Sequence, residues 1–263
     1  MSTAHSLQAH DVELAYGERT IASNLSVSIT PGKITSIIGP NGCGKSTLLK
    51  ALARLLKPTS GTVTLNGIAL SEWNSKKLAH NLGLLPQTPL APEGISVTDL
   101  VGRGRTPYQG MLGRWSSRDY DAVAHAMNVT GISDLAERTI DELSGGQRQR
   151  VWIAMALAQE TEVLLLDEPT TYLDVTHQLD VLDLLKDLNT TSATTIVMVL
   201  HDLNLAAHYS DELIAMREGK IICTGTPEEV VTEENVHEIF QLTSKVITDP
   251  VSGSPMVIPI GRW

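Results

Sequence analysis

The spacing of apolar residues changes several times along the chain, and each change predicts an element. Residues 7–17 (LQAHDVELAYG) alternate apolar and polar side chains and end in glycine, which predicts an edge strand and a turn. Residues 25–29 (LSVSI) predict a second strand, closed by a Pro-Gly pair. An apolar run at 33–38 then enters a glycine-rich turn, and a helical pattern (KSTLLKALARLL) begins at Lys45. The chain therefore opens with strands, followed by a turn and a helix.

Short helical patterns fill the middle of the chain, between two groups of strands. They run from about 97 to 158 and include a connector rich in Gly, Pro and Arg at 102–114. Apolar runs of strand length return at 163–166 and 195–200, and IAMREGKIICTG (214–225) resembles a hairpin. We predict an α/β core interrupted by a mainly helical insertion. The predicted bounds are a core at about 1–92 and 159–224, an insertion at about 93–158 and a C-terminal extension at about 225–263.

The segment GPNGCGKST at the predicted turn has the pattern G-x-x-x-x-G-K-[ST] of a phosphate-binding loop. Its glycines allow a tight turn whose N–H groups point at an anion, and the following helix adds the positive end of its dipole. Lys45 is predicted to reach the β- and γ-phosphates, and the hydroxyl of Ser46 to ligate Mg²⁺. The predicted nucleotide-binding residues here are Gly39, Pro40, Asn41, Gly42, Cys43, Gly44, Lys45, Ser46 and Thr47.

Two adjacent acids end the apolar run VLLLDEPT (163–170), at the carboxyl edge of a predicted strand, where ligands bind in open α/β sheets. Neighbouring side chains on a strand point opposite ways, so the two acids are expected to have separate tasks. Asp167 would hold Mg²⁺, directly or through water, and Glu168 would orient the attacking water and take its proton. Two acids alone also fit a simple strand end, but beside a phosphate loop they predict a hydrolytic site.

A second candidate anion site, LSGGQ, stands directly before the helical run RQRVWIAMALA. A serine at the N-cap position and two glycines that expose backbone N–H groups suit a bound anion, although the motif alone also fits an ordinary Ser-capped helix. Because the chain has one phosphate loop, we interpret this cradle as serving a nucleotide held by a different subunit. Two copies arranged head to tail would then share two ATP molecules across a two-fold axis. The residues concerned are Ser144, Gly145, Gly146 and Gln147.

Three further residues are weak signals when each is taken alone. Tyr16, at the end of the first strand, can stack on an adenine ring or pack against the core. Gln87 follows a strand-like run and can reach Mg²⁺ and the attacking water, or simply be solvated. His201 follows the run TTIVMVL and can bond the γ-phosphate or have a structural role.

The composition argues against several kinds of partner and location. The net charge of −10 argues against a nucleic-acid backbone as the main partner, because phosphate binding needs clustered cations. The first ten residues lack a basic start followed by an apolar run, and no stretch approaches the ~18 apolar residues that span a bilayer. Two cysteines, Cys43 and Cys223, make no disulfide framework and have no metal-ligand spacing around them. We expect a reduced, cytosolic chain whose contact with a membrane comes through a partner.

The chain resembles the ATP-binding subunit of the ATP-binding-cassette (ABC) family over nearly its whole length. The residues and motifs that carry the resemblance are Tyr16, GPNGCGKST, Gln87, LSGGQ, VLLLDEPT, Leu173-Asp174 and His201. The resemblance implies a P-loop NTPase (RecA-like) α/β core with an N-terminal antiparallel β element and an inserted α-helical subdomain. It implies ATP and Mg²⁺ as cofactors, with Gln87 linking Mg²⁺ to a transmembrane partner and residues 144–147 clamping the opposite subunit's γ-phosphate. It also implies that His201 fixes the γ-phosphate and that Asp174 carries signals between the two sites.

Within the family, the sequence is most similar to ATPases of bacterial ferric-siderophore importers, especially the ferric-enterobactin type. The resemblance implies an integral membrane permease, indirect action with a siderophore-binding protein, and a peripheral place on the cytoplasmic face of the inner membrane. Tyr172 replaces the small residue common in the family, which suits this branch, and Cys43 places a thiol beside the phosphates. The segments that carry the likeness are 101–115, 143–161, 164–180, 200–221 and 249–261.

Two other interpretations remain open at this point. One is an ABC ATPase without a permease, acting in iron–sulfur cluster assembly or as a mechanical clamp. The other keeps transport but changes the cargo to haem or a cobalamin, whose importers use similar subunits. Co-purification with an integral membrane protein would favour transport over the first alternative.

Overall fold

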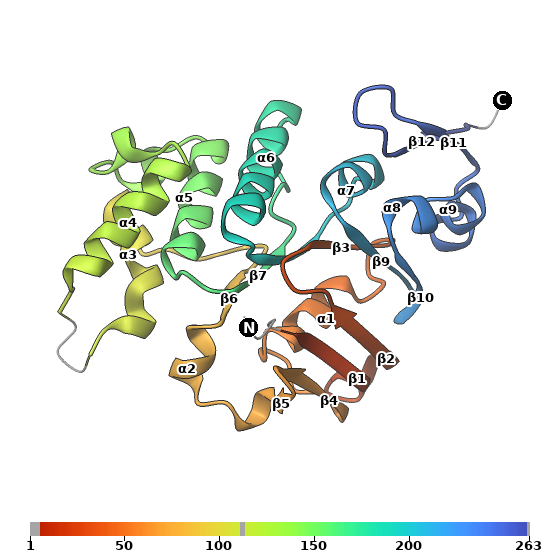
Figure 1. The fold of residues 1–263 in the computed structure, drawn as a ribbon, viewed down its shortest axis with the longest axis horizontal. Coiled ribbons are helices and arrows are strands. Elements are labelled where there is room, and N and C mark those ends of the chain that lie inside the picture. Colours follow the sequence, from red (N-terminus) through yellow and green to blue (C-terminus); the bar gives the residue numbers. More distant parts are fainter. Residues whose placement is uncertain (1–5, 111–113, 262–263) are drawn as a thin grey trace. The chain divides into compact units, whose positions relative to one another are not determined.

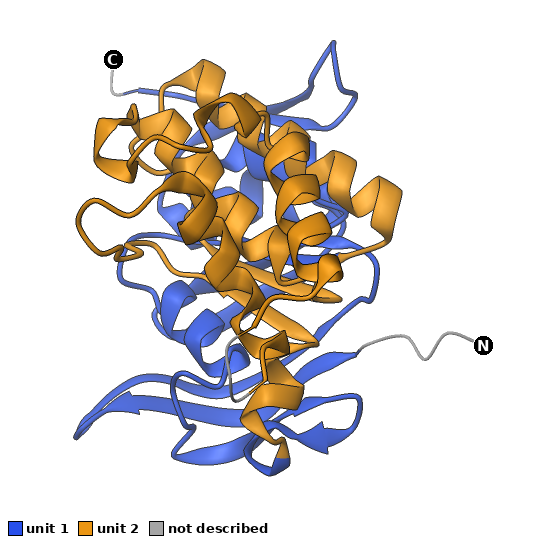
Figure 2. Cartoon of the chain, turned by 90° about the vertical axis from the view of Figure 1, so that its left-hand side faces the viewer, with its two compact units in different colours: residues 1–72, 195–263 blue, residues 73–194 orange. Residues whose placement is uncertain are grey.

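The computed structural model describes residues 6–110 and 114–261, in two compact units (Figures 1 and 2). Unit 1 contains the described residues of 1–72 and 195–263, and unit 2 contains those of 73–194. Residues 111–113 of the predicted connector lie outside the described residues. Within the part of the chain that the structure describes, no helix is both long and apolar enough to cross a membrane.

Unit 1 begins with an antiparallel sheet, as the resemblance to the ABC family implies. The predicted strand at 7–17 forms, but it pairs with a strand on each side, so the prediction that it is an edge strand is wrong. The strand predicted at 25–29 is longer and starts at Arg19. The apolar members of its alternation, Leu25, Val27 and Ile29, are buried. The strand order is β2-β1-β4-β5, with bounds β1 (Leu7–Tyr16), β2 (Arg19–Ile29), β4 (Ser60–Leu65) and β5 (Ile68–Ala69).

Four further strands of unit 1 lie side by side in the order β10-β9-β3-β8: β3 (Ile34–Ile38), β8 (Thr195–Val199), β9 (Glu212–Arg217) and β10 (Lys220–Gly225). β3 pairs in parallel with both β8 and β9. Every residue of β3 and β8 is buried, which is typical of parallel strands covered on both faces. The predicted hairpin is β9–β10, and its turn has positive φ at both Glu218 (49°) and Gly219 (75°), as a type I′ hairpin turn requires.

The helices of unit 1 are short. The helix predicted from Lys45 begins there but ends earlier than its pattern, because Arg54 takes a left-handed conformation (φ 60°) and Leu55 is exposed. A C-terminal hairpin lies beside α7 (Figure 1). The remaining bounds are η1 (Leu70–Glu72), α1 (Lys45–Leu52), α7 (Leu203–Tyr209), α8 (Pro227–Val230), α9 (Glu233–Phe240), β11 (Ser244–Thr248) and β12 (Pro255–Pro259).

Unit 2 is mainly helical and contains one pair of parallel strands, β6 (Leu82–Leu85) and β7 (Val163–Asp167). Helices α3, α4 and α5 pack against one another, and their apolar faces form a core with Val101, Val123 and Ile153 (Figure 1). The helices are α2 (Ser75–Ala79), α3 (Val97–Gly102), η2 (Arg103–Tyr108), α4 (Ser117–Val129), η3 (Ser133–Leu135), η4 (Ile140–Glu142), α5 (Gly145–Ala158) and α6 (Val175–Ser192).

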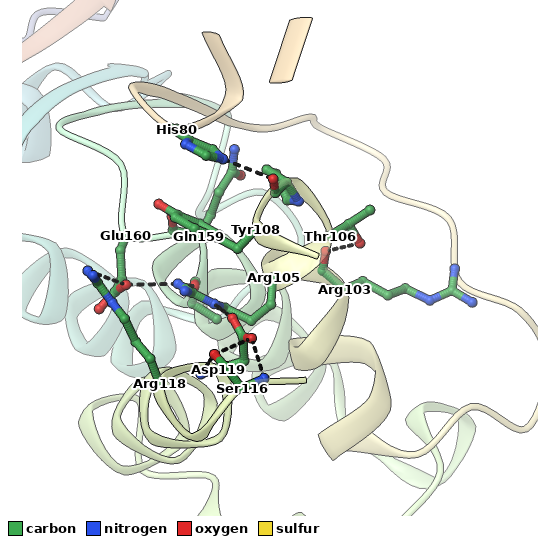
Figure 3. A network of polar contacts seen from close by, with 12 residues as sticks. His80, Arg103, Arg105, Thr106, Tyr108, Ser116, Arg118, Asp119, Gln159 and Glu160 are labelled. Carbon is green, nitrogen blue, oxygen red and sulfur yellow. Dashed lines mark hydrogen bonds and ion pairs between the residues drawn. The ribbon is translucent and has the colours of Figure 1, made fainter. Parts of the chain in front are cut away.

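A buried arginine joins three of these elements (Figure 3). Arg105 of η2 is 1% exposed, and its guanidinium donates to Asp119 of α4, to the carbonyl of Ala158 at the end of α5, and to Glu160, each at 2.8 Å. It also lies 3.8 Å from the ring centroid of Tyr108. Because its donors meet two carboxylates and a carbonyl, the buried charge is compensated.

Candidate functional site

The predicted phosphate loop connects β3 to α1 in unit 1, in the strand–turn–helix context that its pattern requires. Gly39, Gly42 and Gly44 have φ values of 147°, 76° and 107°, which side chains rarely allow. A Cβ atom on Gly39 would lie 2.1 Å from the carbonyl oxygen of Met216, so this position admits only glycine. The loop therefore takes its tight form because of its glycines.

The side chain of Lys45 lies inside this loop. Its ammonium donates to the carbonyl oxygens of Gly39 at 2.8 Å and Pro40 at 3.1 Å, and the residue is 5% exposed. Ser46 is half-buried, and Asn41 and Gly42 are exposed. A cation is thus held at the mouth of a turn that ends in a helix N-terminus, an arrangement that suits an anion.

Cys43, in the same loop, is buried. Burial raises the pKa of its thiol, and this outweighs the lowering by the Lys45 charge and by backbone hydrogen bonds. The thiol therefore stays protonated at neutral pH, and a protonated thiol is a poor nucleophile.

The strand register brings His201 beside this loop. Ile37 of β3 is paired with Val199 of β8, and the N–H of Leu200 donates to the carbonyl of Ile37 at 3.3 Å. Neighbouring parallel strands end at the same edge of the sheet. Two residues beyond the pair Ile37–Val199, the chain therefore reaches Gly39 after β3 and His201 after β8 at that edge. His201 is exposed at that edge. The structure thus brings together two sequence-predicted elements that are far apart in the chain.

Tyr16 lies at the tip of the β1–β2 hairpin and is 48% exposed, so it does not fill the core. The same hairpin reaches the phosphate loop through Ile21, which a Cβ on Gly44 would approach to 3.6 Å. The ring is available for stacking on the side of unit 1 that carries this hairpin.

In unit 2, β7 ends at Asp167, which is buried, and Glu168 follows with a left-handed backbone (φ 54°). Such a conformation is strained for a residue other than glycine and re-aims the side chain after the strand. The Glu168 carboxylate accepts hydrogen bonds from the amide of Gln87 at 2.6 Å and the hydroxyl of Thr171 at 2.9 Å. The structure therefore brings Gln87 and Glu168 into contact.

The segment 144–147 begins α5 as predicted. The hydroxyl of Ser144 accepts from the N–H of Gln147 at 3.2 Å, and the side chain of Gln147 accepts from the N–H of Ser144 at 3.1 Å, which is a capping box. Further along α5, the amide of Gln149 donates to the carbonyl of Pro169 at 2.7 Å. The helix that starts at the LSGGQ motif is thereby bonded to the loop after Glu168.

Asp174 caps α6, and His177 joins it to the start of α5. Asp174 accepts from the backbone N–H of His177 at 2.9 Å and lies 2.6 Å from the Nδ1 atom of its ring. Hydrogen bonds from the backbone and side chain of His177 lower the pKa of Asp174. A Cβ on Gly146 would lie 2.4 Å from the same ring, so the imidazole occupies the space that a side chain there would need.

Two contacting residues escaped the sequence-based prediction, Thr171 and His177. Thr171 follows Glu168 by three residues, a spacing at which a hydroxyl commonly bonds back within a turn. His177 occupies the third helical position after the cap Asp174, from which a polar side chain reaches back to the cap. The local signals were present, but they do not distinguish these residues from ordinary turn and cap residues.

The described residues contain no group of three or more His, Cys, Asp or Glu side chains suited to hold a metal ion by themselves. The buried carboxylate of Asp167 in unit 2 and the hydroxyl of Ser46 in unit 1 are each an oxygen ligand of the kind that Mg²⁺ prefers.

Comparison with known proteins decides the family. Residues 22–171 match the family described as ABC transporter, which is more than half of the chain. The chain belongs to the ABC transporter family. The ABC chain is therefore an ATP-binding subunit and an ATPase, with a P-loop NTPase core, an N-terminal antiparallel sheet and helices inserted into it. The predicted fold class is confirmed.

Two relatives and one solved structure extend the match. The ferric enterobactin transport ATP-binding protein FepC of Escherichia coli (strain K12) is 52% identical over 256 residues, 97% of this ABC chain and 94% of the relative. The iron(3+)-hydroxamate import ATP-binding protein FhuC of Bacillus subtilis (strain 168) is 48% identical, over 97% of this chain and 94% of the relative. A dimeric ATP-binding cassette in a post-hydrolysis state with ADP and Pi superposes with a TM-score of 0.73 at 28% identity, covering 84% of this chain and 98% of that one. Cassettes of this family thus form dimers.

Proposed function

We propose that this ABC ATPase powers the import of a ferric siderophore through a separate permease in the bacterial inner membrane. The observation that carries the proposal is the extent of the likeness to FepC. The family match ends at residue 171, whereas the likeness to FepC covers 97% of the chain at 52% identity. Proteins that share half of their residues over their whole length commonly bind similar partner proteins and have similar sites.

The predicted residues supply the groups that ATP hydrolysis needs. Lys45 is held at the mouth of the phosphate loop by carbonyl oxygens, and phosphate oxygens would replace these as partners of its ammonium. Tyr16 would stack on the adenine, and His201 would donate to the γ-phosphate from the edge of β8. Mg²⁺, when bound, would neutralise phosphate charge, with Ser46, Asp167 and Gln87 as its protein ligands.

Glu168 is proposed as the general base. The amide of Gln87 and the hydroxyl of Thr171 are neutral groups that donate to the Glu168 carboxylate. They hold the carboxylate in one orientation, so that one of its oxygens can point at the attacking water. Such a group takes the proton from water as the water attacks the γ-phosphate. The left-handed backbone at Glu168 is consistent with this role, because strain of this kind gathers at functional positions.

A second copy of the chain is proposed to complete each nucleotide site. Ser144, Gly145, Gly146 and Gln147 at the start of α5 would clamp the γ-phosphate held by the opposite copy, and Asp174 would link the two sites through His177. Closing the head-to-tail dimer on ATP, and opening it after hydrolysis, would be the mechanical stroke.

The partners follow from the same proposal. The permease would seat its cytoplasmic helices against a helical insertion at about 93–158 and near Gln87, which places the ATPase on the cytoplasmic face of the membrane. A siderophore-binding protein outside that membrane would act indirectly, and the net charge of −10 opposes a nucleic-acid partner.

The test is uptake of radioactive iron by the source bacterium after deletion of the gene and complementation. Wild-type protein should restore uptake from ferric catecholate or hydroxamate siderophores, whereas Glu168→Gln, present in equal amount, should not. Restoration of haem or cobalamin uptake alone would show that the proposed cargo, a ferric siderophore, is wrong. Unchanged uptake of every one of these cargoes in the deletion strain would contradict the role in import.

A further inference from the structure

The side chain of Asn204 joins α7 to the C-terminal hairpin of unit 1. Its amide Nδ2 donates to the carbonyl of Val257 at 3.2 Å, and its Oδ1 accepts from the N–H of Val257 at 2.7 Å. The carboxamide therefore satisfies both backbone groups of one residue in β12, as a neighbouring strand would. Val257 is buried at this contact, and the two hydrogen bonds are partly shielded from water.

The hairpin itself is fixed from its other side. In β11 the N–H of Val246 donates to Glu233 of α9 at 3.3 Å, and Lys245 forms an ion pair with the same carboxylate at 2.9 Å. At its turn, hydrogen bonds from Ser252 and Val251 lower the pKa of Asp249, and the charge of His208 in the last turn of α7 adds to this effect. α7 is thus bonded to the hairpin near its first turn, and the helix lies beside β12 (Figure 1).

α7 depends on such contacts for its direction. It has only 7 residues, and a helix of this length is not stable alone in water. At its far end the hydroxyl of Ser210 donates to Ser36 of β3 at 2.6 Å. At its near end Asp202 caps the helix by accepting from the N–H groups of residues 204 and 205. His201 directly precedes this cap, so the direction of the first turn sets where the imidazole is aimed.

We propose that Asn204 is a positioning residue for His201, and that the C-terminal hairpin serves the ATPase reaction through this one side chain. The inference rests on the proposed role of His201 at the γ-phosphate. Asn204 is not proposed to touch the nucleotide itself. Without its carboxamide, Val257 loses two hydrogen bonds, the first turn of α7 separates from β12, and the imidazole samples orientations that miss the phosphate.

The test is a double-mutant cycle on the full-length dimer, measured by single-turnover ATP hydrolysis and by steady-state kcat and KM. Asn204→Ala should lower the hydrolysis rate about three- to thirtyfold while KM stays within about twofold. Asn204→Asp, which keeps the acceptor for the Val257 N–H, should lower it less. The double variant with His201→Ala should be no slower than His201→Ala alone, because Asn204 acts through that residue.

The matched control is Asn235→Ala. Asn235 also bonds backbone carbonyls in the C-terminal part of the chain, those of Glu229 and Val230, but neither α7 nor β12 takes part. Its rate should stay within about twofold of wild type.

Each outcome separates this inference from the proposed function. Normal hydrolysis by Asn204→Ala, with slow hydrolysis by His201→Ala, overturns the positioning role and leaves that of His201 standing. Rate losses that multiply in the double variant would mean that Asn204 acts independently of His201, which also overturns it. A fully active His201→Ala would remove the proposed role of His201, and the inference with it.

Discussion

Hydrogen bonds to near neighbours fix the orientation of several single side chains of this ABC ATPase. The Glu168 carboxylate has two donors, the Lys45 ammonium has two carbonyl acceptors, and the Asp174 carboxylate accepts both from the backbone and from the ring of His177. Fixed orientation of this kind lowers the reorganisation needed when substrate arrives. The residues proposed to act on the nucleotide are therefore oriented by hydrogen bonds to their neighbours.

The thiol of Cys43 offers a test of the phosphate loop. Because burial raises its pKa, alkylation by N-ethylmaleimide should be slow at pH 7 and accelerate about tenfold per pH unit below that pKa. Cys223 is less buried and should be labelled first. Mass spectrometry of each cysteine should show that Mg-ATP slows labelling of Cys43 and leaves Cys223 unchanged. Equal labelling of Cys43 with and without Mg-ATP would place the nucleotide elsewhere.

A second prediction concerns His177, whose ring lies between Asp174 and Gly146. His177→Ala removes one hydrogen bond from Asp174 and the packing surface of Gly146, so kcat should fall about 2- to 12-fold, as expected for about 0.5–1.5 kcal/mol. The control is His125→Ala, an exposed histidine of α4, whose kcat should not change. Equal kcat values for the two variants would show that the contact is incidental.

At the scale of elements, the sequence predicts those helices and strands that a local pattern of residues encodes. Apolar runs and a glycine-rich turn located β3 and α1, and the serine of LSGGQ located the start of α5. The end of α1 was predicted too late, because the apolar pattern continues to Leu56 although Arg54 turns left-handed. The bonds of Gln87 to Glu168, Asn204 to Val257 and Arg105 to Asp119 depend on where segments meet in three dimensions, which no local periodicity reports.

The network around Arg105 shows how one buried side chain stabilises several elements (Figure 3). Hydrogen bonds from Ser116 and Arg105 lower the pKa of Asp119 to about 2, so this carboxylate is charged at all ordinary pH values. The end of α5, the start of α4 and η2 all meet at this charge pair.

Arg105→Met should therefore destabilise the protein strongly. The substitution leaves the buried Asp119 carboxylate without its cation, which typically costs about 3–5 kcal/mol, and urea unfolding should move to a lower midpoint accordingly. Arg118→Met provides the control. Arg118 pairs with the same Glu160 at 3.3 Å but its side chain is 74% exposed, so its loss should change stability by less than about 1 kcal/mol. Similar midpoints for the two variants would contradict the importance given to burial.

At the scale of the whole molecule, we propose that the two units have different roles. Unit 1 contains the phosphate loop, His201 and Tyr16, which are proposed to bind the nucleotide. Unit 2 contains Glu168, Gln87 and the cradle at 144–147, which are proposed to act on water and on the nucleotide of a second copy. Membership of the ABC family and the near full-length likeness to FepC connect these tasks to transport.

We propose that this chain hydrolyses ATP with Glu168 as the general base. The most direct measurement is the steady-state ATPase rate of purified Glu168→Gln beside the wild type, with bound ATP and dimer content measured by gel filtration. The amide keeps the size of the side chain but cannot take the proton, so turnover should fall at least about 100-fold while ATP binding persists and the dimer accumulates. Turnover within a few-fold of wild type would contradict the account.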